Sequence, residues 1–315
     1  MRVLALTAGL VLGLGIPALA QEPIIATPAP APAAELMELG YDRHSRPTLP
    51  VMIGDAGPYS FLIDTGAQAT VLSRELADAL ALFDRRPATL IGMASRVTTH
   101  TVALTGLGIG QRRTDVPRAV LVDGQNIGGT DGVLGLDALQ GQRVLFDFVR
   151  RTMSIAAAGE ARSNRGYEIV VRARARAGQL IITDATVEGV RTAIVIDTGA
   201  QLSVGNAALA RRLRAQQVEQ TELSDINGTL AYGHLHVAER AEVGRLAMSK
   251  VPIVFAQSPA FQALDLEDRP AMFLGMRELR LLRRVAIDFR SRRILFDVPT
   301  SDREIAEAWA RLLEP

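Results

Sequence analysis

The amino-acid sequence predicts a mostly β protein that is built from two homologous halves. From about residue 41 onward, short apolar runs rich in Val, Ile and Leu are separated by Gly, Asp, Asn and Pro. That texture is typical of many short strands joined by tight turns. Helical stretches are few, and the pattern of one half recurs in the other, which indicates duplication of a single structural unit.

The segment 1–20 has the features of a secretory signal peptide. Arg2 provides a basic start, an apolar run covers residues 3–16, and ALA at 18–20 forms a small-x-small cleavage site. The alternative is an uncleaved membrane anchor, but the apolar run is shorter than the ~20 residues that a spanning helix needs. We therefore expect cleavage, no transmembrane segment in the mature chain, and a periplasmic or secreted location in a bacterium.

Residues 21–40, which Pro and Ala dominate up to residue 34, are expected to form an extended linker. The 35 basic and 34 acidic residues of the chain leave a net charge of +1 and form no basic stripe. Nucleic acid is therefore not expected as a partner. The sequence has no cysteine, which excludes cysteine nucleophiles and thiolate metal ligands, while a chain of this size can build its core without disulfides.

The internal repeat is clearest in FLIDTGAQATVLS (61–73) and AIVIDTGAQLSVG (193–205). Asp64 and Asp197 occupy the same place in the two copies. Further along, VLG in the first half is matched by FLG in the second, so that Leu134 and Gly135 correspond to Leu274 and Gly275. The repeat predicts an N-terminal lobe at 41–158, a polar connector at 159–166 and a C-terminal lobe at 167–300.

Three helices are expected between or after the strands. The first covers residues 74–82, and its counterpart in the second half covers residues 207–215. The third lies in the C-terminal segment 301–315, where SDRE at 301–304 has the pattern of a capping box.

Placing a carboxylate at the end of a buried strand costs free energy, so such a residue is expected to have a polar partner or a functional role. Two halves related by a pseudo-two-fold axis can bring Asp64 and Asp197 together, and a close carboxylate pair shares one proton. The ionised member can deprotonate a water, and the protonated member can stabilise the oxyanion that forms on a carbonyl group. This predicts amide hydrolysis without a metal, a cofactor or a covalent intermediate.

The residues after each aspartate suit that task. A threonine hydroxyl can hydrogen-bond the backbone where the two loops cross, and a glycine lets the chain turn tightly and brings an N–H close to the carboxylates. A small alanine keeps the turn uncrowded. These residues are Thr65, Gly66 and Ala67 in the first copy and Thr198, Gly199 and Ala200 in the second.

The two DTGA motifs, each after an apolar strand, resemble the active-site loops of the pepsin/retropepsin superfamily of aspartic proteases. DTGA is closer to the retroviral type and its bacterial relatives than to pepsin, and the two apolar-apolar-Gly segments also match. The resemblance covers residues 41–299. It implies an all-β, pepsin/retropepsin-like acid protease fold with two homologous β-barrel lobes, and a monomer that binds a protein or peptide substrate in extended form in a cleft between the lobes.

The resemblance further implies glycine-containing hairpin flaps over the cleft. The candidates are residues 91–100, which include Met93, Ala94 and Ser95, and residues 226–234, which include Asn227 and Gly228. Asn-Gly is a hairpin-turn signal. The first candidate lacks the tyrosine of a pepsin-type flap, and Tyr232 of the second is not assigned that contact.

Other polar clusters favour structural roles. His234 and His236 share a strand face, but no third ligand accompanies them, so no metal site is expected. Asp147 and Asp288 recur at matching positions and are interpreted as structural. We predict an exported aspartic endopeptidase. A catalytically inactive peptide-binding module on the same fold, and a structural partner that uses only the lobe surfaces, remain as alternatives.

Overall fold

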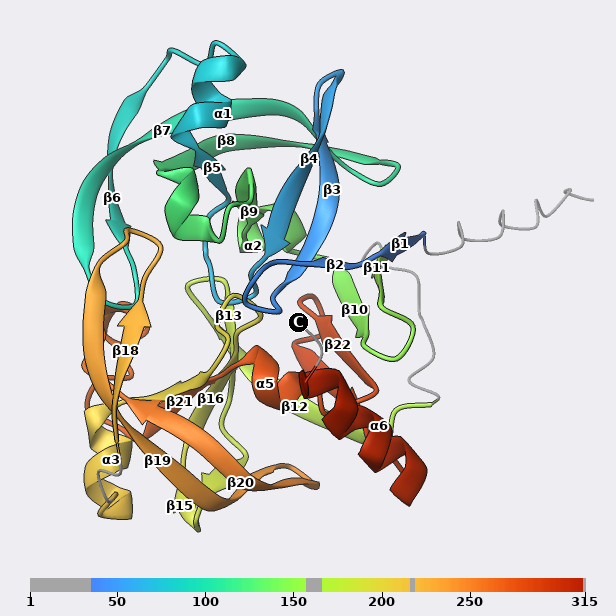
Figure 1. Ribbon diagram of the computed structural model, residues 1–315, viewed down its shortest axis with the longest axis vertical. Coiled ribbons are helices and arrows are strands. Elements are labelled where there is room, and N and C mark those ends of the chain that lie inside the picture. The colour runs from blue at the N-terminus through green and yellow to red at the C-terminus, as the bar shows by residue number, and fades with distance from the viewer. Residues whose placement is uncertain (1–34, 157–165, 216–218, 314–315) are drawn as a thin grey trace, which may run out of the picture. The chain divides into compact units, whose positions relative to one another are not determined.

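The computed structural model describes residues 35–156, 166–215 and 219–313 (Figure 1). The predicted signal peptide (1–20), most of the predicted linker and all but Gly166 of the predicted connector lie outside the described residues. No helix within the described ranges is long and apolar enough to cross a membrane. The described part is mostly β and contains two repeated lobes, as the sequence predicts.

The first lobe is a closed barrel of six strands. Hydrogen bonds run in the order β3-β4-β9-β5-β8-β7, and β7 returns to pair with β3. The elements of this lobe are β2 (Gly40–Tyr41), β3 (Pro47–Ile53), β4 (Ala56–Ile63), β5 (Val71–Ser73), α1 (Arg74–Ala79), β6 (Arg86–Ile91), β7 (Arg96–Ile109), β8 (Arg112–Val122), the 3-10 helix η1 (Gly124–Ile127), β9 (Gly132–Leu134) and α2 (Leu136–Leu139).

The second lobe repeats this plan, with the counterpart of β3 divided into β13 and β14. The order is β13-β16-β21-β17-β20-β19-β14. Its elements are β13 (Gln179–Ile182), β14 (Ala185–Val187), β15 (Val190–Arg191), β16 (Ala193–Ile196), β17 (Ser203–Gly205), α3 (Ala207–Leu213), β18 (Glu219–Ser224), β19 (Leu230–Val243), β20 (Leu246–Phe255), α4 (Pro259–Ala263), β21 (Ala271–Leu274) and α5 (Met276–Leu279).

Six further strands form a sheet that joins the two lobes. Each half supplies three strands, and the order is β1-β11-β10-β22-β23-β12. The central pair, β10 and β22, is antiparallel, with Leu145 opposite Ala286. These strands are β1 (Leu36–Glu38), β10 (Arg143–Asp147), β11 (Thr152–Ala156), β12 (Ile169–Arg176), β22 (Arg284–Asp288) and β23 (Arg293–Asp297).

The structure corrects the predicted end of the linker at residue 40. Leu36–Glu38 pairs with residues 154–152 of β11 and is therefore the outer strand of the joining sheet. The corresponding strand of the second half is β12, which starts at Ile169. Leu36 and Ile169 are separated by the same number of residues as the two DTGA motifs, so the two strands occupy equivalent places in the repeat. A strand this short cannot show a hydrophobic period, so only its pairing partner reveals it.

The three predicted helices are present, but two end earlier than predicted. α1 stops at Ala79 because Ala81 adopts a left-handed conformation with φ of 55°. α3 stops at Leu213 because Arg214 does the same with φ of 51°. α6 (Asp302–Leu313) starts after Ser301, whose Oγ accepts the N–H of Glu304 at 3.3 Å.

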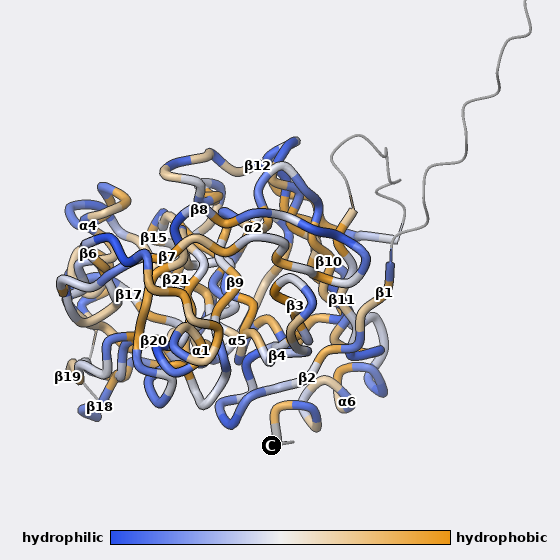
Figure 2. The backbone as a smooth tube through the Cα atoms, turned by 90° about the horizontal axis from the view of Figure 1, so that it is seen from above, coloured by the Kyte–Doolittle hydropathy of each residue, from blue (hydrophilic) through white to orange (hydrophobic). Residues whose placement is uncertain are grey.

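The apolar core lies inside the barrels and under the joining sheet. Its largest cluster takes residues from both halves, including Phe61, Phe146 and Phe296, all fully buried. Figure 2 shows this as orange backbone along interior strands such as β9 and blue backbone at many outer turns. Because burial anchors the strands on both sides, the loops that leave β4 and β16 start from rigid positions.

Candidate active site

The two aspartates stand directly after strands that are held in the same way. β4 pairs in parallel with β9, with Ile63 opposite Leu134, and the Asp64 N–H donates to the Leu134 carbonyl at 3.0 Å. In the second lobe β16 pairs in parallel with β21, and the Asp197 N–H donates to the Leu274 carbonyl at 3.0 Å. The predicted apolar-apolar-Gly segments therefore lie beside the strands that carry the aspartates.

The glycines that end these segments permit a close crossing of chains. A Cβ on Gly275 would stand 2.7 Å from the Leu202 carbonyl carbon, and one on Gly135 would stand 2.8 Å from the Thr70 nitrogen. Real Cβ atoms do not approach backbone so closely, so only glycine fits. The Gly275 N–H donates to Ser203 Oγ at 3.1 Å, which further holds the segment in place.

The DTG loops bring the two carboxyl groups together, because the glycine of each loop packs against the carboxyl group of the other. Oδ1 of Asp64 accepts the N–H groups of Gly66 at 2.7 Å and Ala67 at 3.0 Å. Oδ1 of Asp197 accepts those of Gly199 at 2.9 Å and Ala200 at 3.1 Å. Asp197 is 6% exposed and Asp64 is half-buried.

The two threonines lock the loops of the two lobes together. The Thr65 N–H donates to Thr198 Oγ1 at 3.0 Å, and the Thr198 N–H donates to Thr65 Oγ1 at 3.3 Å. Each hydroxyl also donates to a carbonyl in the opposite half, that of Ile196 at 2.8 Å and that of Ile63 at 2.7 Å. Both side chains are buried, so these bonds are shielded from competing water.

Burial raises the pKa of both aspartates, because desolvation disfavours the charged form. The pKa of Asp197 is raised well above its usual range, by burial first and then by the negative charge on Asp64. On Asp64, the N–H donors and the guanidinium of Arg46 oppose the effect of burial on the pKa. A pair in this environment holds one proton and one negative charge.

Two residues that the sequence analysis did not single out also contact the loops. Arg46 Nη1 donates to the Gly199 carbonyl at 3.1 Å, and Gln179 Nε2 donates to the Gly66 carbonyl. Arg46 and Gln179 are separated along the chain by the same interval as the two aspartates. The shared interval could have paired Arg46 with Gln179 in the sequence. An arginine and a glutamine are chemically too different, however, for a comparison of the two repeats to match them.

The predicted flap residues lie at the tips of two hairpins. Met93, Ala94 and Ser95 form part of the turn between β6 and β7, while Asn227 and Gly228 lie in the turn between β18 and β19. These hairpins lie side by side in Figure 1, at its left edge.

Hydrogen bonds join the two tips. Asp225, which the sequence analysis did not single out, is 4% exposed. It accepts the Ala94 N–H at 3.1 Å and the Ser95 hydroxyl at 2.7 Å, and Asn227 Nδ2 donates to Ser95 Oγ at 2.8 Å. An aspartate in a turn shows no sign in the sequence that its partner lies in a different hairpin.

Each tip also packs against the opposite half. Met93, from the first half, packs on an apolar cluster that contains Val195 and Phe273, and Val195 lies shortly before Asp197 on the same strand. Ile226, from the second half, packs on a cluster that contains Leu62, which stands in the same place before Asp64. The hairpins thus connect the lobes beside both strands that lead to the aspartates.

The remaining polar motifs have structural contacts. Asp147 Oδ1 accepts the Arg150 N–H and Asp288 Oδ1 accepts the Ser291 N–H, both at 2.8 Å, so each aspartate closes a turn after its strand. His236 packs against Phe255, with its ring 3.7 Å from Glu188. Among residues 35–156, 166–215 and 219–313, no group of three His, Asp or Glu side chains is arranged to hold a metal ion.

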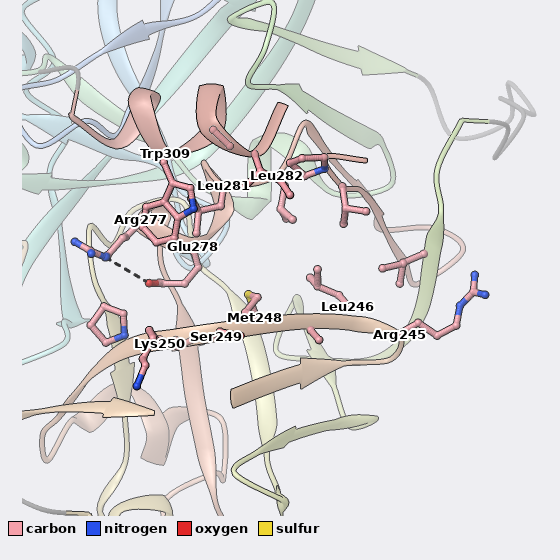
Figure 3. A pocket seen from close by; sticks show the side chains of 18 residues that line it. Arg245, Leu246, Met248, Ser249, Lys250, Arg277, Glu278, Leu281, Leu282 and Trp309 are labelled. Carbon is pink, nitrogen blue, oxygen red and sulfur yellow. Dashed lines mark ion pairs between the residues drawn. The ribbon is translucent and has the colours of Figure 1, made fainter. Parts of the chain in front are cut away.

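A cavity of about 360 Å³ lies elsewhere, between β20, α5 and α6 (Figure 3). Its lining includes Met248, Glu278 and Trp309 but neither Asp64 nor Asp197. Glu278 faces Arg277 there at 4.0 Å. Glu278 is the one carboxyl group among the residues that line this cavity, so the lining has no pair of acids like Asp64 and Asp197, and the aspartate pair is the candidate active site.

Comparison with known families agrees with this geometry. The family model of aspartyl protease matches the chain twice, at residues 49–138 and 183–277. Each match contains one of the two DTGA loops and its glycine-ended segment, and together they cover more than half of the chain. A search of curated proteins finds no match. The chain belongs to the aspartyl protease family.

Proposed function

We propose that this family member is an active endopeptidase that is exported from a bacterial cell and hydrolyses proteins or peptides of the cell envelope. The observation that carries the proposal is the intact pair of Asp64 and Asp197, which lie together in two loops of the same construction. An inactive relative would need neither a second buried carboxyl nor the four N–H donors that orient the two. Export rests on the signal-like segment at residues 1–20.

The pair can perform hydrolysis with its own protons. The ionised carboxylate takes a proton from a water, and the water oxygen forms a bond to the peptide carbonyl carbon. The protonated carboxyl donates a hydrogen bond to the carbonyl oxygen as charge develops there. Collapse of the tetrahedral intermediate breaks the C–N bond, and a proton passes to the leaving nitrogen. The threonine bonds keep both carboxyls oriented, so little reorganisation accompanies the reaction.

The hairpins β6–β7 and β18–β19 would act as flaps. Their tips, which the Asp225–Ser95 contact joins, connect the two lobes beside the strands that lead to the aspartates. An extended peptide could then form strand-like backbone hydrogen bonds with them. Because one chain supplies both aspartates, we expect a monomer with pseudo-two-fold symmetry.

The test is cleavage of an unfolded protein substrate between acidic and neutral pH by the wild type and by the variants Asp64→Asn and Asp197→Asn. Each variant should lose at least ~1000-fold in kcat/KM, since general acid–base catalysis is removed. The variant Asp55→Asn is the matched control, because this exposed aspartate lies in the turn at the opposite end of β4 and its loss should leave the rate unchanged.

Two outcomes would contradict the proposal. Cleavage that survives Asp64→Asn would exclude the dyad mechanism. A folded wild type that binds a statine-type inhibitor or a peptide but cleaves nothing would favour the inactive peptide-binding module. Export is tested separately by cell fractionation and N-terminal sequencing, which should find a mature chain that begins at Gln21.

A further inference from the structure

The repeat places two different side chains at one equivalent position behind the active-site loops. Arg46 immediately precedes β3, and Gln179 begins β13, which is the counterpart of β3 in the second lobe. Each donates a hydrogen bond across to the carbonyl of the DTG glycine of the other half, Gly199 for Arg46 and Gly66 for Gln179. The hydrogen bonds are equivalent, but one donor carries a positive charge and the other is neutral.

The orientation of the Arg46 guanidinium is fixed by Asp42. Arg46 Nε and Nη2 donate to Asp42 Oδ2 at 2.8 Å and 2.6 Å, and the Asp42 side chain is only 1% exposed. The other oxygen of Asp42 accepts the N–H groups of His44 at 2.9 Å and Arg46 at 2.8 Å. With the Nε–Nη2 edge bound to Asp42, Nη1 is left to contact Gly199.

The two glycines transmit this asymmetry to the aspartates. Gly199 packs so closely on the Asp64 carboxylate that a Cβ there would overlap it, and Gly66 packs on Asp197 in the same way. A cation therefore lies behind the glycine that touches Asp64, and a neutral amide lies behind the glycine that touches Asp197. The charged groups that bear on Asp64 are Asp197, Arg46 and, behind Arg46, its partner Asp42.

We propose that Arg46 places the single negative charge of the pair on Asp64 and so leaves the shared proton on Asp197. This inference rests on the proposed function, because it assigns roles within the same site: Asp64 is the base that activates water, and Asp197 is the acid that faces the carbonyl oxygen. Arg46 is then a positioning residue that acts through electrostatics. Without it, the two loops present nearly the same donors to both carboxyls, and only the lower exposure of Asp197 would still favour the proton there.

The electrostatic environment supports this placement. The guanidinium opposes the effect of burial on the pKa of Asp64, whereas burial and then the charge on Asp64 are the largest influences on the pKa of Asp197, and both raise it. An opposite charge within about 4–6 Å lowers a carboxyl pKa by roughly 1–3 units. Because Asp42 neutralises part of the guanidinium charge, we expect the effect on the pair to be at the low end of that range.

The test is a ¹³C NMR titration of the aspartate carboxyl carbons in the purified protein, with the two signals assigned from Asp64→Asn and Asp197→Asn. In the wild type the Asp64 signal should titrate at the lower pH. The double variant Arg46→Gln/Asp42→Asn gives both halves a neutral donor without leaving a buried carboxylate unpaired. In this variant the first titration of the pair should move up by about 1 pH unit, and the Asp64 and Asp197 signals should share that titration more evenly than in the wild type.

A variant that keeps the positive charge at residue 46 distinguishes an electrostatic role of Arg46 from a purely structural one. Arg46→Lys should retain most of the wild-type separation between the two signals, and Gln179→Leu, which removes the neutral counterpart, should not move the first titration upward. If the substrate is cleaved, the acidic limb of kcat/KM against pH should shift with the NMR titration in the double variant.

Three results would overturn the inference. They are an Asp197 signal that titrates first in the wild type, a titration in the double variant that coincides with the wild type, and an Arg46→Lys variant that titrates like the double variant. A wild type without peptidase activity would refute the proposed function instead, because the NMR titration can still be read in that case.

Discussion

Glu278 allows a quantitative test of how burial acts on this structure. Its side chain lies beside the cavity of Figure 3 with 2% exposure. Ser203 Oγ donates to Glu278 Oε2 at 2.5 Å, and the Arg277 Nε is 4.0 Å from Oε1. Burial raises the pKa of Glu278 from 4.5 to about 7, and the hydroxyl and the arginine only partly oppose it.

The sign of the effect on stability follows from proton binding. Between pH 4.5 and 7 the folded protein retains the proton on Glu278 while the unfolded chain loses it. The contribution of Glu278 to the free energy of unfolding therefore has its full value below pH 4.5, falls as the pH rises to 7, and is level above that. The folded and unfolded pKa values differ by about 2.5, and each unit is worth ~1.4 kcal/mol, so the loss is about 3 kcal/mol.

The substitution Glu278→Gln removes the titration and keeps the contact, because the amide oxygen can accept the Ser203 hydroxyl. The unfolding free energy of the variant relative to the wild type should rise by about 3 kcal/mol between pH 4.5 and pH 8. Urea denaturation at both pH values measures it. A difference between variant and wild type that stays constant over this range would refute the reasoning.

The matched control for Glu278 is Glu239→Gln. Glu239 is an exposed glutamate that pairs with Lys250 at 2.6 Å. This variant still contains Glu278, so the fall in stability between pH 4.5 and 7 should persist in it.

Substitutions at three further positions test the site. Gly199→Ala places a methyl group against the Asp64 carboxylate and should lower kcat/KM about 100-fold with the fold retained by circular dichroism; an active variant would contradict the close packing. Thr198→Val leaves a buried N–H and a buried carbonyl unpaired and should cost about 2–5 kcal/mol in urea unfolding, whereas Thr198→Ser should cost less than half of that. Asp225→Ala should speed amide hydrogen exchange at Ala94 at least tenfold, and unchanged exchange would mean that the hairpin tips do not depend on this residue.

Much of the site could be predicted from the sequence because its essential parts are local and duplicated. An apolar strand followed by Asp-Thr-Gly-Ala specifies a short loop. Two copies of this loop, each in register with its own VLG or FLG segment, predict two equivalent lobes whose carboxyl groups meet. The structural role of the glycines could be predicted for the same reason. Where two chain segments cross too closely for a Cβ atom, both repeats have a glycine at the same position.

Features that depend on contacts between unlike residues could be found only in the folded chain. Arg46 and Gln179 share a position but no chemistry that a repeat search detects, and only the fold shows that each contacts a glycine of the other half. Asp225 meets Ser95 from 130 residues away, in a bond between two turns that are each ordinary when read alone. The pair of acids follows from the sequence because their loops are local. The asymmetry around the pair follows from packing, because electrostatic fields depend on distances in space and not on spacing along the chain.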